Sequence, residues 1–242
     1  MFRSQRKKPG HLALQYSVGL AGLIEDPSPV MPMSNPTVCA ILAVISLIPS
    51  VTLAAVPQDP AQVVPLAVGT TIPTVTVRSP DGRDRELGPG SLVKPTVLIF
   101  YRGGWCPYCN THLGELRKAE APLVDLGYDL LFLSADRPEL LYSSLKEPGL
   151  NYTILSDARM AAARAYGVAF RVDDATAARY KGFGIDLEAA SGETHHELPV
   201  PAVFIVDRSG VIRFVYANAD YKIRLAPEVL LAEARRVARP GP

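Results

Sequence analysis

The sequence predicts an α/β fold in which a central mixed β-sheet is flanked by helices. Short, largely apolar runs at 96–100 and 128–134 are typical of buried parallel strands. Helical patterns alternate with such runs along the chain, as they do where helices cover the faces of a parallel sheet. Two later runs, 202–206 and 211–215, flank a short turn at 207–210 and predict an antiparallel hairpin, which makes the sheet mixed.

The elements of this fold follow from local patterns in chain order. Residues 57–75 are rich in Pro, Val and Thr and predict a linker that enters the first extended segments. Turns are expected at Asp81-Gly82 and at Gly88-Pro-Gly90, because glycine and proline favour them. From there we expect a strand at 96–100, a helix from Pro107 with an apolar stripe, a strand at 128–134, a short helix at 138–146 and a strand at 152–155. An Ala-rich helix at 158–166 should follow and end at Gly167, and after it a polar helical insert at 172–180 with a loop through Gly192. The hairpin and a closing helix from Pro227 to about Ala238 complete the expected order.

Length and composition exclude several classes of protein. The chain has 242 residues, with 25 Lys and Arg against 24 Asp and Glu. This length suits one domain with additional segments and a large core. The balanced charge lacks the basic excess typical of nucleic acid-binding proteins, so we expect no nucleic acid partner. Three cysteines are too few for a disulfide-stabilised scaffold.

The N-terminal region does not have the pattern of a packed domain. Prolines interrupt residues 1–38, so we expect an extension that is disordered or that results from a start assigned too early. Residues 39–55 carry an apolar core with the length of a signal-peptide h-region, and Thr52-Leu-Ala54 offers small residues to a signal peptidase. The alternative is an uncleaved membrane anchor, although the run is short for a span and contains Pro49. Residues 56–242 then form the folded domain.

The distribution of basic residues predicts that this domain is exported. Arg and Lys lie before the apolar run and none follows it until Arg78, so the positive-inside rule places the domain outside the cytoplasm. A start at Met31 or Met33 would keep the same apolar run. We therefore expect a periplasmic or secreted protein, or one anchored to the membrane by residues 39–55 if the leader is not cleaved.

The stretch Phe100–Cys109 has the local pattern of a reactive thiol. Cleavage of the leader would leave Cys106 and Cys109 as the only cysteines. Two glycines permit a sharp turn after the strand, Cys106 lies at the expected helix N-cap, and Pro107 suits the first helical turn. Unpaired N–H groups and the helix dipole at this end stabilise a thiolate and lower its pKa.

Other uses of two close cysteines fit less well. A structural zinc site needs about four ligands, and only His112 lies near the pair as a third. A haem attachment needs His directly after the second cysteine, where the chain has Asn110. The pattern therefore favours redox chemistry over a metal site or an inert disulfide, and we expect no metal.

These residues carry a resemblance to known families. Trp105-Cys-Pro-Tyr-Cys109 resembles the active-site turn of thioredoxin-fold proteins, and Cys-Pro-Tyr-Cys is the form found in glutaredoxins. The longer stretch Val97–Asn110 is more similar to the peroxiredoxin-like branch of the AhpC/TSA superfamily. The resemblance implies a thioredoxin fold, in a peroxiredoxin-like variant with an N-terminal extension. It covers roughly residues 60 to 238 and continues through the segments 132–138, 155–157 and 198–210.

Aligned with thioredoxins, the motif implies a thiol–disulfide oxidoreductase. Cys106 takes the place of the exposed, low-pKa nucleophile and Cys109 that of the resolving thiol, and together they form a redox-active disulfide that needs no other cofactor. Trp105 would flank the site as a docking surface, with Pro107 and Tyr108 forming the turn between the cysteines. The expected partners are protein or low-molecular-weight disulfides and a thiol reductant or oxidant.

The same resemblance singles out Pro201, which comes immediately before a predicted buried strand. In thioredoxin folds a cis-proline at this place packs against the active-site disulfide, and a cis bond before proline costs little. We therefore expect Pro201 in the cis form and the Val200 backbone in the groove where an extended partner pairs. The alternative is a trans proline that merely begins a strand.

The histidines offer one candidate base. Many thioredoxins have a buried acid five residues before the Trp, where this chain has Phe100. His112 is three residues past Cys109 on the same helix face and is a candidate proton acceptor, the alternative being an exposed helix residue. We expect His195 and His196 to be solvated in a polar loop.

Two other functions stay open. In a thiol peroxidase acting on peroxides, Cys109 would be peroxidatic and Cys106 resolving. The peroxiredoxin alignment puts Arg102 at the usual Pro position, Cys106 at the Thr position and Pro201 at the position of a distant Arg, so Arg102 is the nearby source of positive charge. The third possibility is a non-enzymatic module that holds a structural disulfide or binds metal.

Overall fold

The computed structural model describes residues 55–141 and 152–239. The predicted extension at 1–38, the apolar segment up to residue 54 and the end of the predicted helix at 138–146 lie outside these residues. No helix among the described residues is long and apolar enough to cross a membrane.

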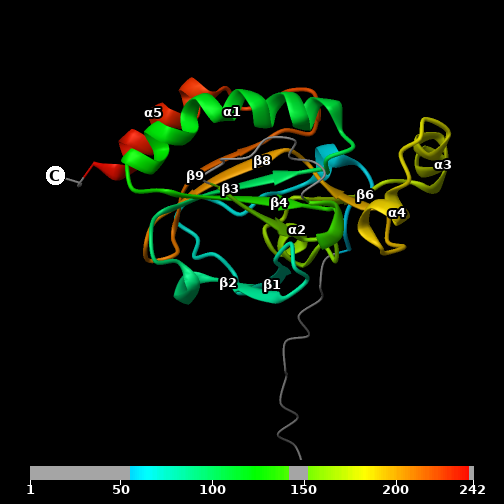
Figure 1. Ribbon diagram of the computed structural model, residues 1–242, viewed down its shortest axis with the longest axis horizontal. Coiled ribbons are helices and arrows are strands. Elements are labelled where there is room, and N and C mark those ends of the chain that lie inside the picture. The colour runs from blue at the N-terminus through cyan, green and yellow to red at the C-terminus, as the bar shows by residue number, and fades with distance from the viewer. Residues whose placement is uncertain (1–54, 142–151, 240–242) are drawn as a thin grey trace, which may run out of the picture. The chain divides into compact units, whose positions relative to one another are not determined.

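A seven-stranded mixed sheet forms the centre of the described domain, as predicted (Figure 1). Strands β3, β4 and β5 run parallel to one another, whereas β8 pairs antiparallel with β3, and β1 pairs antiparallel with β5. Across the sheet the order is β2 (Asp84–Leu87), β1 (Val75–Arg78), β5 (Thr153–Ser156), β4 (Asp129–Ser134), β3 (Thr96–Tyr101), β8 (Ala202–Val206) and β9 (Ile212–Ala217).

Helices cover both faces of this sheet. Figure 1 shows α1 and α5 side by side on one face, α2 on the opposite face, and α3 with α4 beyond one end of the strands. The helices are α1 (Pro107–Asp125), α2 (Ala161–Ala165), α3 (Asp174–Gly182), α4 (Leu187–Ser191) and α5 (Pro227–Ala238), with 3-10 turns at Pro60–Gln62, Pro89–Ser91 and Pro138–Leu140.

Strand β3 is apolar throughout because both of its faces are buried. Side chains alternate along a strand, so Val97 and Ile99 pack with α1 and α5, while Leu98 and Phe100 pack with α2. The Phe100 ring lies 5.2 Å from that of Tyr166, which follows α2. The carboxyl end of β3 is thereby fixed in the middle of the domain.

Helix α2 is shorter than the predicted helix at 158–166. The Asp157 carboxylate accepts hydrogen bonds from the N–H groups of Ala162 and Ala163, at 2.9 and 2.7 Å. Met160 takes a left-handed backbone conformation and caps the helix. A tight turn therefore precedes the helix where the alanine-rich pattern alone predicted a further turn of it.

The insert is more ordered than predicted. Strand β6 (Ala169–Arg171), at the start of the insert, pairs antiparallel with β7 (Glu197–Pro199), which follows the insert. The two strands form a second small sheet and bring the two ends of the insert together. Helix α4 replaces the predicted loop and is capped by Asp186, whose side chain accepts from the Ala189 N–H at 3.0 Å.

The predicted linker at 57–75 also packs on the domain. Ile72 is buried in the core. The Pro57 carbonyl accepts from the Arg171 N–H at 2.8 Å, and the Leu66 N–H donates to the Tyr166 carbonyl at 3.0 Å. Proline-rich composition predicted irregular structure here, but did not predict these main-chain contacts.

Candidate active site

The segment between β3 and α1 carries the two cysteines. Strand β3 ends at Tyr101, and α1 begins at Pro107 with Cys106 as its N-cap, as predicted. Gly103 has a φ of +142°, and a Cβ at this position would overlap the Trp105 indole and lie 2.6 Å from an Asp136 carboxylate oxygen. The turn therefore requires glycine at this position.

Asp136, two residues past the end of β4, holds this turn. Its buried carboxylate accepts from the Gly104 N–H at 2.7 Å and from the Ser134 hydroxyl at 3.0 Å. Burial raises the pKa of Asp136, and these two hydrogen bonds oppose the rise. On the other side, the Asn110 side chain donates to the Gly104 carbonyl at 2.8 Å. Asp136 was not singled out from the sequence, although the carboxyl ends of parallel strands β3 and β4 meet at this edge.

Both cysteines are buried, so the prediction of an exposed Cys106 was wrong. Cys106 is 1% exposed and Cys109 0% exposed, and both are unbonded thiols. They belong to the apolar cluster between the sheet and α1, with Trp105 packed against it. An N-cap residue has no inherent exposure, because neighbouring elements decide what covers it.

The two thiols differ in acidity. A hydrogen bond from the Cys109 thiol, together with the Cys109 N–H and the charges of Arg102 and Arg224, outweighs burial and lowers the pKa of Cys106 to about 6. Burial, followed by the interaction with Cys106, raises the pKa of Cys109, and Arg224 and the Arg102 main chain oppose that rise. The low-pKa thiol at the helix N-terminus is therefore Cys106, as predicted.

Arg102 brings a positive charge to the site. Its side chain is buried, and a guanidinium N–H donates to the Tyr180 hydroxyl at 2.9 Å. The guanidinium lies 4.3 Å from the centre of the Tyr221 ring and 5.1 Å from that of Trp105. Its Nε is buried without a hydrogen-bond partner. Arg102 thus joins the active-site turn to the insert and to the segment after β9.

Arg224 is a site residue that sequence reasoning missed. Its Nη2 donates to the Cys109 Sγ at 3.3 Å, and its Nε donates to the Tyr221 carbonyl at 2.8 Å. It lies between β9 and α5, 115 residues from Cys109. No motif marks this segment, so only the packing of α5 beside α1 brings the arginine to the sulfur.

His112 is buried, so the alternative of an exposed helix residue was wrong. Its Nε2 lies 3.0 Å from the Leu225 carbonyl, so this nitrogen carries the hydrogen. Burial, which outweighs that bond, lowers the pKa of His112. The neutral imidazole anchors the segment before α5 to α1, and its role as a proton acceptor stays a prediction.

The prediction of solvated histidines after α4 was also wrong, because both side chains are engaged in contacts. His195 Nε2 lies 2.8 Å from the Ala158 carbonyl, and its Nδ1 accepts from the Glu197 N–H at 2.8 Å. His196 Nε2 lies 2.9 Å from a carboxylate oxygen of Glu188 on α4. His195 thus ties this segment to the domain at Ala158, whereas His196 ties it to α4.

The prediction of a cis bond before Pro201 was wrong, since no described peptide bond is cis. The Val200 N–H donates to the Val168 carbonyl at 2.9 Å, and the Pro201 carbonyl accepts from the Asn218 N–H at 3.1 Å. Both residues are buried between the small sheet and β8. Val200 therefore has no free N–H for an extended partner.

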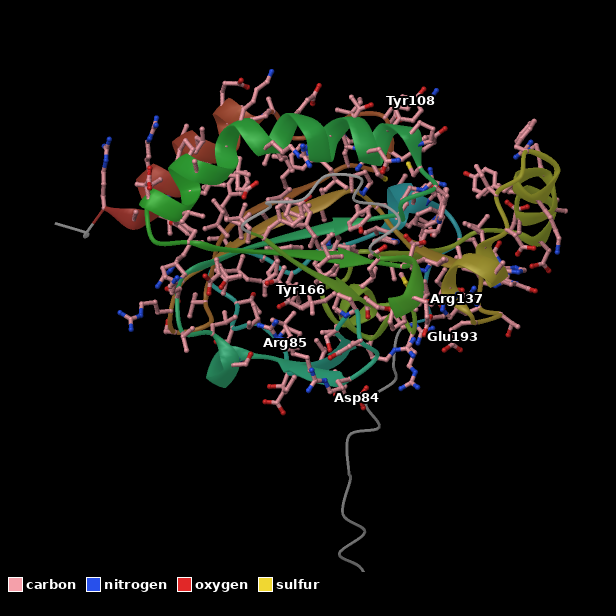
Figure 2. The ribbon with its side chains drawn as sticks, viewed as in Figure 1. Asp84, Arg85, Tyr108, Arg137, Tyr166 and Glu193 are labelled. Carbon is pink, nitrogen blue, oxygen red and sulfur yellow. The ribbon has the colours of Figure 1, made fainter. Side chains whose placement is uncertain are left out.

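The turn residues between the cysteines lie at the surface. Pro107 is exposed, and Tyr108 is 45% exposed at the start of α1, where Figure 2 shows it at the outer surface. The Tyr108 ring meets that of Tyr221 edge-on, with centroids 5.5 Å apart. Within the described residues, no group of three or more His, Cys, Asp or Glu side chains is placed to hold a metal ion.

The chain is similar to known peroxiredoxins. It is 31% identical over 103 residues to bcp of Haemophilus influenzae, which is named as a peroxiredoxin, covering 43% of this chain and 66% of the relative. It is 25% identical over 150 residues to the chloroplastic peroxiredoxin Q of Sedum lineare, covering 62% of this chain and 68% of the relative. The matches thus span about two thirds of these relatives, slightly less for bcp.

Solved structures support the fold. Reduced Prx3 of Vibrio vulnificus in complex with H2O2 superposes with a TM-score of 0.56 at 17% identity, covering 70% of this chain and 99% of that chain. The peroxidoxin BcpB of Mycobacterium tuberculosis gives a TM-score of 0.53 at 19% identity, covering 71% of this chain and 98% of that chain. Both establish the peroxiredoxin-type thioredoxin fold. Residues 68–215, more than half of the chain, match the AhpC/TSA family, so the chain belongs to that family of oxidoreductases.

Proposed function

We propose that the protein is a thiol-dependent peroxidase in which Cys109 reduces a peroxide and Cys106 resolves the oxidised sulfur. The observation that carries the proposal is the pair of buried, hydrogen-bonded thiols at the start of α1, flanked by two guanidinium groups, in a chain of the AhpC/TSA family. A thiolate in such a setting is stabilised by charge and by N–H donors.

Burial of the sulfurs favours a small oxidant. With Cys106 and Cys109 almost fully enclosed, a disulfide in a folded protein cannot approach either sulfur in line without displacing the covering residues. Hydrogen peroxide is only slightly larger than water and needs a much smaller displacement. This is the physical reason for putting peroxide ahead of protein disulfides as substrate.

The reaction balances with these two thiols. The Cys109 sulfur attacks the peroxide O–O bond, becomes a sulfenic acid and releases an alcohol, or water when the substrate is hydrogen peroxide. The Cys106 thiolate then attacks the sulfenic sulfur and displaces hydroxide, which takes a proton from solvent to become water, and a disulfide is left between the two residues. Two thiols are oxidised and one peroxide is reduced. A thiol reductant must then return the disulfide to the starting pair.

Cys106 also has the position of a base for the first step. The Cys109 thiol donates its hydrogen bond to Cys106, whose pKa is lowered to about 6 and which is therefore a thiolate at neutral pH. As Cys109 attacks, its proton can move along this bond to Cys106 and from there to the oxygen that leaves the peroxide, which restores the Cys106 thiolate for the second step. The high pKa of Cys109 alone would otherwise disfavour it as the attacking sulfur.

The proposal is tested by mixing the reduced 55–242 chain with hydrogen peroxide and following the fluorescence of Trp105, the only tryptophan. Cys106→Ser and Cys109→Ser variants run alongside. We expect rapid oxidation of the wild type, sulfenic acid in Cys106→Ser, and slow oxidation of Cys109→Ser. Wild-type oxidation no faster than that of a free thiol would overturn the proposal, and oxidation that needs only Cys106 would overturn the assignment of roles.

A second candidate function is thiol–disulfide exchange with Cys106 as nucleophile and Cys109 as resolving thiol. The low pKa of Cys106 favours it, because the thiolate is the attacking form. Cys109→Ser should then accumulate mixed disulfides between Cys106 and substrate proteins. Non-reducing electrophoresis of tagged protein from an extract tests this, and the absence of adducts would rule the function out.

We also propose that the enzyme acts outside the cytoplasm, as a periplasmic or secreted protein. The support is the apolar segment at 39–55 and the distribution of basic residues around it. Mass spectrometry of the full chain expressed in a host with a periplasm tests the proposal. Recovery of a periplasmic form that begins near Ala55 would support it, and a full-length cytoplasmic product would refute it.

A further inference from the structure

We propose that Arg224 is a catalytic residue, whose guanidinium holds the Cys109 thiolate and orients the peroxide that this thiolate attacks. The inference rests on the proposed peroxidase function and adds to it a residue from outside the Phe100–Cys109 stretch. In the resemblance to peroxiredoxins, the position of the distant arginine is occupied by Pro201, which carries no charge. Arg224 contacts the Cys109 sulfur instead, from the segment between β9 and α5.

The first support is direct contact with the reacting atom. The Arg224 Nη2 lies 3.3 Å from the Cys109 Sγ, within hydrogen-bond distance for sulfur. A guanidinium has five N–H donors in a fixed plane. One is used on Cys109 and one on the Tyr221 carbonyl, so others remain for the oxygens of a peroxide beside the sulfur.

The second support is that the arginine is held in place by its own segment. Asn218, Asp220 and Lys222 form consecutive tight turns, in which the Asn218 side chain accepts from the Asp220 N–H at 2.9 Å and the Asp220 side chain accepts from the Lys222 N–H at 3.0 Å. On the other side of Arg224, the Leu225 carbonyl is fixed to His112. A guanidinium fixed in this way loses little freedom when the thiolate forms.

The third support is charge. No carboxylate of the described residues forms an ion pair with Arg224 or with Arg102, so two cations face the sulfur pair without an acidic partner. Arg224 contacts the Cys109 sulfur directly, and its charge opposes the rise in the Cys109 pKa. An anion at Cys109 would therefore meet an unneutralised positive charge.

The test measures the acidity of Cys109 by itself. In the 55–242 chain carrying Cys106→Ser, Cys109 is the only cysteine, and its thiolate can be titrated by ultraviolet absorbance. Adding Arg224→Gln should raise the Cys109 pKa by about one unit or more, a tenfold loss of thiolate at a given pH. Arg224→Lys should retain part of the effect. The matched control is Lys222→Gln, which removes an exposed positive charge from the same segment without touching the sulfur.

The oxidation rate separates orientation of the peroxide from acidity. Single-turnover oxidation by hydrogen peroxide, compared at equal thiolate fractions, should fall about 10-fold to 100-fold in Arg224→Gln and stay unchanged in Lys222→Gln. Circular dichroism and melting curves establish that the variants are folded, with Arg224→Lys as the variant that keeps the charge.

The outcomes distinguish this inference from the proposed function. An unchanged Cys109 pKa and an unchanged rate in Arg224→Gln would overturn the role of Arg224, even if the wild type reduces peroxide quickly. A shifted pKa in a protein whose wild type does not react with peroxide would overturn the peroxidase function and the catalytic role, while leaving Arg224 as the group that stabilises the thiolate.

Discussion

At the scale of single residues, the two thiols behave as one titrating unit. Cys109 donates to Cys106, so the same hydrogen bond lowers the pKa of one and raises that of the other. One proton is therefore lost near pH 6 and the second only at much higher pH. The pair is set to hold a single negative charge at neutral pH, between Arg102 and Arg224.

Cys109→Ala removes this hydrogen bond, and we predict that the pKa of Cys106 rises from about 6 towards that of an ordinary cysteine. The sign follows from the thiolate: it is present above the pKa and lost below it, so a higher pKa leaves less thiolate at pH 7. Alkylation of Cys106 by iodoacetamide at pH 7 should slow about tenfold or more. Cys109→Ser, which keeps a donor, is the control. An unchanged pH profile would mean that the arginines and the helix set the acidity.

The turn between β3 and α1 also depends on a single residue, Gly103. Gly103→Ala would place a Cβ against Trp105 and Asp136 in a backbone conformation that side chains rarely adopt. We predict a loss of about 1–3 kcal/mol in the free energy of unfolding, together with slower oxidation. Gly114→Ala is the matched control, because Gly114 lies in α1 with open space around it and alanine favours a helix by up to about 1 kcal/mol. Equal stability of the two variants in urea denaturation would contradict the prediction.

At the scale of elements, the insert is linked directly to the active site. Tyr180 on α3 accepts a hydrogen bond from Arg102, and its ring is one of three that surround that guanidinium. The insert therefore acts on the cysteines through Arg102, whose charge helps to lower the pKa of Cys106.

Tyr180→Phe tests this link, since it removes the hydroxyl and keeps the ring. It leaves a buried N–H of Arg102 without its acceptor, so we predict a loss of about 1–3 kcal/mol in stability and a higher Cys106 pKa. The thiolate should appear at higher pH in an absorbance titration. Phe183→Leu, at a 74% exposed position just after α3, is the control and should change neither quantity. A destabilised variant with an unchanged titration would show that Tyr180 is structural only.

Elements and site residues that depend on local pattern were predictable, and those that depend on long-range packing were not. Strand β3, the start of α1 and the hairpin of β8 and β9 follow from apolar runs, glycine turns and a capping position. The β6–β7 pair and the burial of Cys106 depend on what another part of the chain covers. Arg102 meets Tyr180 across 78 residues and Cys109 meets Arg224 across 115, and no local signal encodes such pairs.

At the scale of the whole molecule, the described domain begins at the first residues after the apolar segment. The Pro57 carbonyl bonds to Arg171 of β6, and Val63 and Leu66 pack against the core. Residues 57–66 therefore contribute to the small sheet and to the face covered by α2, although the active site is far away in sequence. These contacts set a physical limit on how late in the sequence a stable chain can start.

Shortening the chain tests that limit. A chain of residues 55–242 keeps every contact described above, so we predict that it melts as a single cooperative unit and is oxidised by peroxide at its full rate. A chain of residues 67–242 loses the Pro57–Arg171 and Leu66–Tyr166 bonds together with the packing of Val63 and Leu66. It should melt several degrees lower, because each lost main-chain bond and apolar contact is worth about 1 kcal/mol. Calorimetry on both chains provides the measurement, with the 55–242 chain as reference. Equal melting temperatures would mean that residues 55–66 only lie on the surface, and a 55–242 chain that fails to fold would mean that the domain needs residues from the segment before it.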